Sequence, residues 1–326
     1  MKALVLRPNG APALIDRPVP RPRAGEVLVR TTAALVCAWD GHPASDEGLG
    51  HEAVGVVRAV GVGVPDAYLG LRVAAEGRGR LAEYFRVPVA GAGLVPLPDR
   101  ITDHQALYAA GALATGLAAA EEAGAPAGGS VAVFGQGAVG LSATVAAGRL
   151  RGARVIAVEP EPRRQLLALR FGADVVVDPA YEDSAERIME LTGGAGADCA
   201  ILATAAPGAT AAARACTAPG GHVTLARCRA GAGGQVGARG ARGAGSGAEA
   251  AGSGAEAAEA GAEDSAAAGE RTARMLDLIG DGLLDPTVMT THEFPFTRVE
   301  EAFRRLSARE PGMVKPIVHF PRRSPS

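Results

Sequence analysis

The sequence is poor in aromatic residues, has no excess of either charge and contains no long apolar run. Phenylalanine, tryptophan and tyrosine make up only 4% of its 326 residues, so the core must consist mainly of valine, leucine, isoleucine and alanine. The formal net charge of −2 argues against a nucleic-acid-binding protein and gives no reason to expect an anionic membrane as a partner. No apolar run reaches the roughly 20 residues that a membrane-spanning helix needs.

Cysteine is also scarce. The four cysteines are Cys37, Cys199, Cys216 and Cys228, and none of them forms a C-x-x-C pair. This irregular spacing suggests a reducing compartment rather than a disulfide-bonded scaffold. The first ten residues lack the pattern of a secretory signal. We therefore expect a cytoplasmic protein, and its length is sufficient for two domains.

The first third of the chain is typical of a β-rich domain. Short apolar runs at Lys2–Leu6, Val27–Arg30 and Val54–Val60 alternate with segments rich in proline and glycine. A helix is predicted over 103–123, with Thr102 as its N-cap.

From Ser130 onward, apolar runs alternate with helical segments. Strands are predicted at 131–134, 155–158, 175–177, 199–202 and 223–225, with helices at 138–150 and 163–171. Apolar runs without polar alternation are typical of a parallel sheet that is covered on both faces. Farther on, the pattern predicts helices at 271–284 and 299–307 and a last strand at 314–320.

The segment 229–270 interrupts this pattern. It consists almost only of alanine, glycine, serine, glutamate and arginine. Such a composition buries too little apolar surface to offset the entropy of ordering, so we interpret the segment as a flexible insert. Its alanine- and glutamate-rich part would at most be weakly helical.

The segment GQGAVG (135–140) fits the dinucleotide-binding motif G-x-G-x-x-G. The motif alone is weak in a chain with 45 glycines, but here it follows a predicted strand and begins a helix, as the motif requires. The amino terminus of that helix offers N–H groups and a positive dipole end to phosphates. The predicted cofactor-binding residues of the loop are Gly135, Gly137, Ala138, Val139 and Gly140.

Glu159 supports this interpretation. It ends the second predicted strand of the series, 19 residues after Gly140. A carboxylate at this position accepts hydrogen bonds from the adenosine ribose and repels a 2′-phosphate, which favours NAD over NADP. Arg163 and Arg164 follow closely, and an arginine here would hold a 2′-phosphate, so NADP stays open.

With these motifs, the chain resembles the medium-chain dehydrogenase/reductase family in its zinc alcohol dehydrogenase branch. The resemblance rests on Gly50-His51-Glu52, LAEYFRVP (81–88), GALATG (111–116), the glycine loop and FGADVVVD (171–178), and it covers nearly everything outside 229–270. It implies an α/β oxidoreductase with two domains. A GroES-like catalytic domain would comprise residues 1–120 and about 290–326, and a Rossmann nucleotide-binding domain would comprise residues 121–289.

The resemblance also implies a catalytic zinc site with Cys37 and His51 as ligands. The family's third ligand corresponds to Gly111, which has no donor side chain, and Glu52 is the candidate to replace it. Zinc would lower the pKa of a bound alcohol and so favour hydride transfer. The alternative is a site that has lost its metal, with Cys37 as a small buried side chain. The cysteines of a structural zinc lobe are absent, so no structural zinc is expected.

The family's proton relay is altered as well. Trp39 stands where the family has serine or threonine, whereas His42 matches the relay histidine. Asp40 matches the acid that orients a metal ligand, and Thr115 matches the threonine beside the nicotinamide.

Three functions therefore stay open for this sequence. The first is a zinc-assisted oxidoreductase that transfers hydride between NAD(H) and an alcohol or carbonyl compound. The others are a zinc-free reductase of activated C=C or C=N bonds and a nucleotide-binding protein without catalysis. The insert occupies the region where the family has a sixth strand and its dimer contact. We therefore expect the usual dimer edge to be altered in any homo-oligomer.

Overall fold

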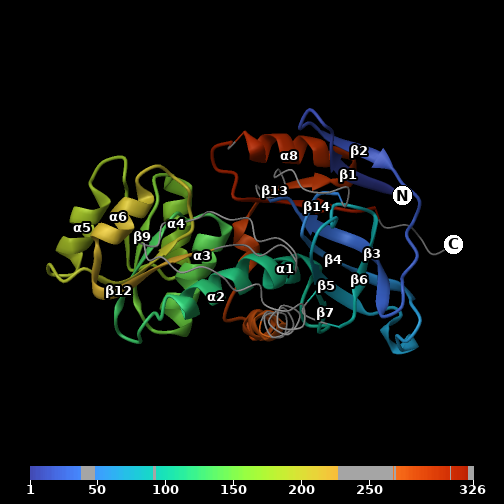
Figure 1. Ribbon diagram of the computed structural model, residues 1–326, viewed down its shortest axis with the longest axis horizontal. Helices are drawn as coiled ribbons and strands as arrows, with labels where there is room; N and C mark the ends of the chain where they lie inside the picture. Colours follow the sequence, from blue (N-terminus) through green and yellow to red (C-terminus); the bar gives the residue numbers. More distant parts are fainter. Residues whose placement is uncertain (38–47, 91–92, 227–266, 268, 309, 322–326) are drawn as a thin grey trace, which may run out of the picture.

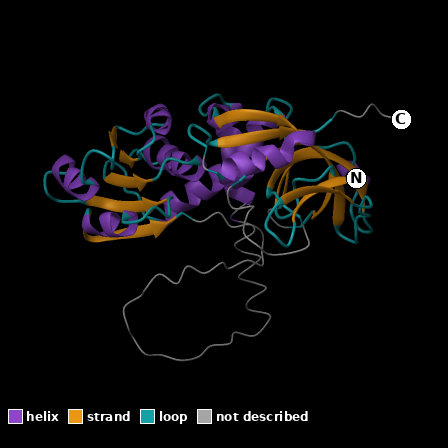
Figure 2. Ribbon diagram, turned by 90° about the horizontal axis from the view of Figure 1, so that it is seen from above, coloured by secondary structure: helices purple, strands orange, loops and turns teal. Residues whose placement is uncertain are grey.

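The computed structural model describes residues 1–37, 48–90, 93–226, 267, 269–308 and 310–321. Two large sheets lie at opposite ends of the molecule, with helices between them (Figures 1 and 2). Trp39, Asp40, His42 and nearly all of the 229–270 segment lie outside the described residues. None of the described helices is long and apolar enough to cross a membrane.

The larger sheet combines strands from the beginning and the end of the chain. Its strands are β3 (Glu26–Leu35), β4 (Glu52–Val60), β5 (Arg72–Glu76), β6 (Tyr84–Pro88), β7 (Leu94–Pro96), β13 (Thr290–Pro295) and β14 (Lys315–His319). They follow the order β13-β14-β3-β4-β5-β7, and β6 pairs with β3. The pairing of β14 with β3, with Ile317 opposite Leu35, brings the end of the chain back to the amino-terminal part. A separate antiparallel pair, β1 (Lys2–Leu6) and β2 (Pro12–Asp16), lies outside this sheet.

The second sheet is parallel throughout, as the sequence predicts. Its strands are β8 (Ser130–Phe134), β9 (Arg154–Val158), β10 (Val175–Val177), β11 (Ala197–Leu202) and β12 (Thr217–Leu225), in the order β10-β9-β8-β11-β12. Alternate residues face two separate cores. On β8, Val131 and Val133 belong to one core, and Ala132 and Phe134 belong to the other. Both faces are therefore apolar, which explains the unbroken apolar run in the sequence.

Helices cover both faces of the parallel sheet and the outside of the larger one. They are α3 (Ala138–Val145) with η4 (Ala146–Leu150), α4 (Pro162–Arg170), α5 (Ser184–Leu191), α6 (Ala209–Ala215) and α8 (Val299–Ser307). Short 3-10 turns are η2 (Asp66–Tyr68), η5 (Pro286–Met289) and η6 (Phe296–Arg298). A further helix covers 269–280, so it begins before the predicted Arg271.

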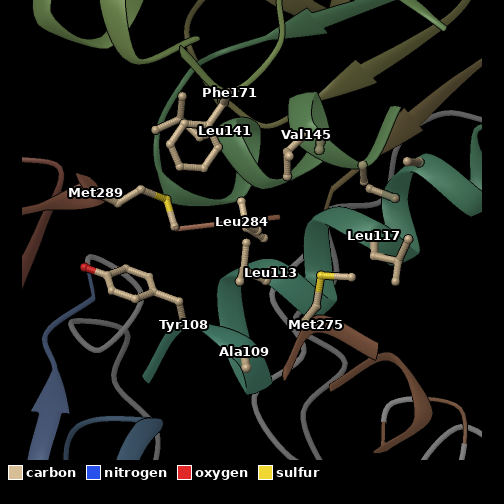
Figure 3. Close-up of a cluster of buried hydrophobic side chains, with 14 of the residues drawn as sticks. Tyr108, Ala109, Leu113, Leu117, Leu141, Val145, Phe171, Met275, Leu284 and Met289 are labelled. Atoms are coloured by element: carbon tan, nitrogen blue, oxygen red, sulfur yellow. The ribbon is translucent and has the colours of Figure 1, made fainter. Parts of the chain in front are cut away.

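A continuous helical stretch connects the two sheets. It comprises α1 (Asp103–Tyr108), the π-helical turn η3 (Ala109–Leu113) and α2 (Ala114–Glu122), which confirms the helix predicted over 103–123. Thr102 caps it: Thr102 Oγ1 accepts a hydrogen bond from the Gln105 N–H, and the Gln105 side chain accepts one from the Thr102 N–H. Apolar side chains of this stretch form a shared core with α3 and the segment 275–289 (Figure 3). The labelled members include Tyr108, Leu113, Leu117, Leu141, Phe171, Met275 and Leu284.

Candidate active site

Cys37 and His51 lie at the same end of one strand pair. Cys37 follows the end of β3, and His51 directly precedes β4. The two strands are antiparallel with Leu35 opposite Glu52, so the end of β3 neighbours the start of β4. His51 is buried and Cys37 is half-buried. The sheet therefore brings both predicted metal ligands to one edge.

The Glu52 carboxylate is buried between this sheet and the connecting helix. Its Oε1 accepts a 2.8 Å hydrogen bond from the Ala112 N–H, and its Oε2 forms an ion pair with the Lys315 ammonium of β14. His51 Nε2 lies 3.6 Å from the same Oε2. Burial raises the pKa of Glu52, but the charges of Lys315 and His51 and the hydrogen bonds from Lys315 and Ala112 outweigh this effect. The pKa of Glu52 consequently lies below its usual value.

Gly111 provides the space in which this carboxylate lies. A Cβ at position 111 would overlap with the Glu52 side chain from Cγ to Oε1. Gly111 belongs to the π-helical turn η3, and such turns occur where another group interrupts the regular helix. The position that lacks a ligand in the sequence is thus filled by the Glu52 side chain, which reaches it from β4.

Glu76 and Arg80 also belong to this region, and no sequence motif pointed to either residue. Glu76 lies opposite Glu52 across β4 and β5. Burial raises the pKa of Glu76 to about 7. The nearby charge of Glu52 also raises this pKa, whereas the charges of His51 and Arg80 lower it in part. The buried Arg80 donates a 2.9 Å hydrogen bond to the Glu76 carbonyl oxygen, and the Gly77 N–H donates to the His51 carbonyl oxygen. The only sequence feature that could have indicated Glu76 is its position as a charged residue at the end of the apolar run of β5.

The donor types at this edge suit zinc. Thiolate, imidazole and carboxylate are common zinc ligands. The 3.6 Å between His51 Nε2 and Glu52 Oε2 is close to the roughly 3.4 Å expected between two ligands of one tetrahedral ion with bonds of about 2.1 Å. Within the described ranges, however, no group of three His, Cys, Asp or Glu side chains is arranged to hold a metal ion. The predicted Asp40 and His42 lie outside these ranges.

The glycine loop has the geometry that its motif requires. It follows β8, and Gly135 has a φ of 85°, a conformation that favours glycine. Gly137 is the N-cap of α3, and a Cβ there would meet nothing within 4 Å, so this face of the loop is open. A Cβ at Gly140 would overlap with the Gly135 carbonyl oxygen, so Gly140 permits the close approach of helix and strand. Ala138 and Val139 form the first turn of α3.

Glu159 lies beside this loop, as the sequence predicts. It follows β9 and is 3% exposed. Its Oε2 accepts a 2.6 Å hydrogen bond from the Gln136 N–H, and its Oε1 accepts a 3.1 Å bond from the Glu161 N–H. The carboxylate therefore joins the loop of β8 to the turn that follows β9.

Arg163 and Arg164 belong to the first turn of α4, and both side chains lie against the turn before β14. Arg164 Nη2 donates a 3.1 Å hydrogen bond to the Met313 carbonyl oxygen. The Arg163 side chain lies beside Gly312. Both arginines thus contact the segment that leads to Lys315.

One helical stretch connects the predicted metal ligands with the glycine loop. Gly111 contacts Glu52, and farther along the same stretch Gly116 packs so closely on Ser142 of α3 that a Cβ would overlap with it. The helix α3 itself begins at the glycine loop. Thr115 lies between these two contacts and is half-buried.

Two family models match the chain. Residues 23–99 match the alcohol dehydrogenase GroES-like domain, and residues 138–229 match the zinc-binding dehydrogenase domain. An alcohol dehydrogenase of Cupriavidus necator is 34% identical over 256 residues, which cover 62% of this chain and 70% of that protein. The NADP-dependent isopropanol dehydrogenase of Thermoanaerobacter brockii is 33% identical over 245 residues, which cover 62% of this chain and 69% of that protein.

Solved structures share the whole architecture. The apo form of zinc-dependent alcohol dehydrogenase 2 from Streptococcus pneumonia has a TM-score of 0.80 at 23% identity and covers 100% of both chains. The 2R,3R-butanediol dehydrogenase of Bacillus subtilis has a TM-score of 0.75 at 23% identity, with 98% of this chain and 99% of that chain covered. Identities this low establish the fold alone. Together with the family models, they confirm the expected α/β fold, in which a GroES-like part is combined with a Rossmann-type part.

Proposed function

The chain belongs to the zinc-type alcohol dehydrogenase branch of the medium-chain dehydrogenase/reductase superfamily, and on this basis we propose that it transfers hydride between NAD(H) and an alcohol or carbonyl substrate. It is an alcohol dehydrogenase-like oxidoreductase. The observation that carries the proposal is the helical stretch 103–122, which contacts Glu52 at Gly111 and α3 at Gly116. We assign residues 1–120 and about 290–326 to the catalytic domain, residues 121–289 to the nucleotide domain, and the protein to the cytoplasm.

The nucleotide is bound by the loop and by Glu159. Main-chain N–H groups of Gly137, Ala138 and Val139 face the pyrophosphate at the amino end of α3. Glu159 accepts hydrogen bonds from the adenosine ribose and disfavours a 2′-phosphate, so NAD is the cofactor. Thr115 packs beside the nicotinamide. NADP is the alternative, since Arg163 and Arg164 stand nearby in the sequence.

The residues that would hold a catalytic zinc ion are Cys37, His51 and Glu52. Bound there, zinc supplies a Lewis acid for the substrate oxygen. From the sequence, we assign to Asp40 the orientation of a metal ligand and to His42 the acceptance of the proton that the alcohol releases; both residues lie outside the described ranges. Lys315 fixes the Glu52 carboxylate from β14.

A specific observation also favours a second function, the zinc-free reduction of activated C=C or C=N bonds. The Glu52 carboxylate is already paired with Lys315, and position 111 offers no ligand. A site of this kind would leave only Cys37 and His51 to hold a metal ion, which is fewer than the three protein ligands of catalytic zinc sites.

One assay separates these functions. The purified chain is mixed with NADH or NAD and a panel of alcohols, ketones and enones, with and without a chelator, and the absorbance of the reduced nicotinamide is followed. Turnover of alcohols or ketones that a chelator and Cys37→Ser both abolish supports the zinc-assisted reaction. Turnover of enones alone, unaffected by a chelator, supports the zinc-free one. Binding of NADH without any turnover contradicts both and leaves a nucleotide-binding protein without catalysis.

A further inference from the structure

The Glu52–Lys315 ion pair occupies the place where the proposed metal site needs a carboxylate ligand. Both side chains are almost completely buried, at 1% and 5% exposure. Such a carboxylate requires a cation beside it, because an uncompensated buried charge is strongly destabilising. In the structure that cation is the Lys315 ammonium.

We propose that Lys315 and a metal ion compete for the Glu52 carboxylate, so that Lys315 sets the metal affinity of the site. The proposal rests on the metal site of the proposed function. Glu52 Oε2 faces both the Lys315 ammonium and His51 Nε2, which lies 3.6 Å away. A divalent cation bound by His51 and Glu52 would therefore lie next to a buried like charge, which weakens its binding.

Gly111 provides the space that the ion-paired Glu52 carboxylate occupies. Because position 111 has no side chain, the Glu52 carboxylate reaches into the turn η3 and accepts the hydrogen bond from the Ala112 N–H. A residue with a Cβ at this position would displace it. The chain thus combines the loss of a ligand at position 111 with a lysine that neutralises the Glu52 carboxylate.

The competition predicts the direction in which replacements of Lys315 change zinc binding. Lys315→Met and Lys315→Gln remove the charge, and Lys315→Arg keeps it. The full-length chain is stripped of metal, and its zinc dissociation constant is measured by competition with a chromogenic chelator. We expect both neutral variants to bind zinc at least about tenfold more tightly than the wild type, and the arginine variant to stay within about threefold of it.

Thermal unfolding provides the second readout. Without metal, the neutral variants should melt below the wild type, and zinc should raise their melting temperature by more than it raises that of the wild type. A neutral variant that folds only when zinc is added would also support the competition between Lys315 and zinc. NADH binding at the glycine loop checks that each variant is folded.

The outcomes distinguish this inference from the proposed metal site. If the wild type binds one zinc ion and the neutral variants bind it equally or more weakly, the competition is refuted while the metal site stands. If both neutral variants stay unfolded in zinc, the competition is refuted as well. If neither the wild type nor any folded variant binds zinc, both the inference and the zinc-assisted function are wrong.

Discussion

The Gln136 N–H donates a 2.6 Å hydrogen bond to Oε2 of Glu159. This bond joins the second residue of the glycine loop to the acid that ends β9, and the same carboxylate also accepts the Glu161 N–H. Glu159 therefore holds the loop in shape, and in the proposed function the same carboxylate also binds the adenosine ribose. Its two roles are inseparable in the geometry, since one carboxylate serves both.

We expect Glu159→Gln to weaken NADH binding about tenfold, because it removes a buried charge-assisted hydrogen bond worth roughly 1–3 kcal/mol. The affinity ratio of NADPH to NADH should rise, because the charge that repels a 2′-phosphate is lost. Titration of NADH fluorescence measures both constants. Glu161→Gln is the matched control, since Glu161 caps α4 two residues later. Unchanged NADH affinity in Glu159→Gln would contradict the assignment of this acid.

Two glycines of the loop should respond differently to the same replacement. A Cβ at Gly137 meets nothing within 4 Å, whereas a Cβ at Gly140 overlaps with the Gly135 carbonyl oxygen. We expect Gly137→Ala to leave the melting temperature nearly unchanged but to weaken NADH binding at least about tenfold, because the methyl group enters the space of the pyrophosphate. Gly140→Ala should instead destabilise the fold by about 1–3 kcal/mol. If Gly137→Ala binds NADH normally, the phosphates do not lie on this loop.

Local sequence best predicted the half of the molecule that contains the parallel sheet. The strands β8 to β11 and the helix that starts at Ala138 lie where the sequence predicts them, because the strands have unbroken apolar runs whose two faces pack against separate cores. The helices α5 and α6 and the strands β2, β6, β7 and β13 escaped prediction. Their segments are short and mix polar with apolar residues, so their pairing partners decide their structure.

The arrangement around Glu52 could not be read from local sequence. Lys315 and Glu52 are far apart in the chain and meet only because β14 pairs with β3 and β3 pairs with β4. The family resemblance named Glu52 as the candidate to replace the ligand that is missing at Gly111. It gave no contact, however, by which the Glu52 carboxylate would enter the volume of a side chain at position 111. The contact depends on three elements whose packing no local pattern encodes.

The edge of the parallel sheet should not support a tight dimer. In the described part of the chain, β12 is the outer strand on this side. It contains Pro219, which lacks an N–H, followed by two glycines, of which Gly220 has a φ of 85°. Such a strand is a poor partner for another edge. We expect light scattering of the full-length chain to give the mass of one copy at micromolar concentration.

If light scattering gives the mass of a dimer instead, a further variant tests whether the dimer forms through β12. Leu225 is 39% exposed at the end of β12, so Leu225→Lys should dissociate a dimer that forms through this edge. If Leu225→Lys dissociates the dimer, the prediction that β12 does not support a tight dimer is wrong. A dimer that persists in this variant would have to form through another surface.

Glu76 should make the metal-free protein less stable as the pH rises. Its pKa is raised from 4.5 to about 7 in the folded state, so the folded chain keeps the proton where the unfolded chain releases it. Its favourable contribution is complete below about pH 4.5 and is lost as the pH rises to about 7. Glu76→Gln stays uncharged at every pH. Between pH 5 and pH 8, the free energy of unfolding of the wild type should therefore fall by about 2 kcal/mol relative to this variant.

Urea unfolding at several pH values, with a chelator present throughout, measures this difference. Glu122→Gln is a suitable control, because Glu122 is exposed at the end of α2 and its replacement should leave the pH profile of the wild type unchanged. Parallel profiles for Glu76→Gln and the wild type would show that the Glu76 carboxyl group is ionised in the folded protein throughout this range. In that case the negative charge opposite Glu52 would be permanent, and a cation at this edge of the sheet would meet two carboxylates instead of one.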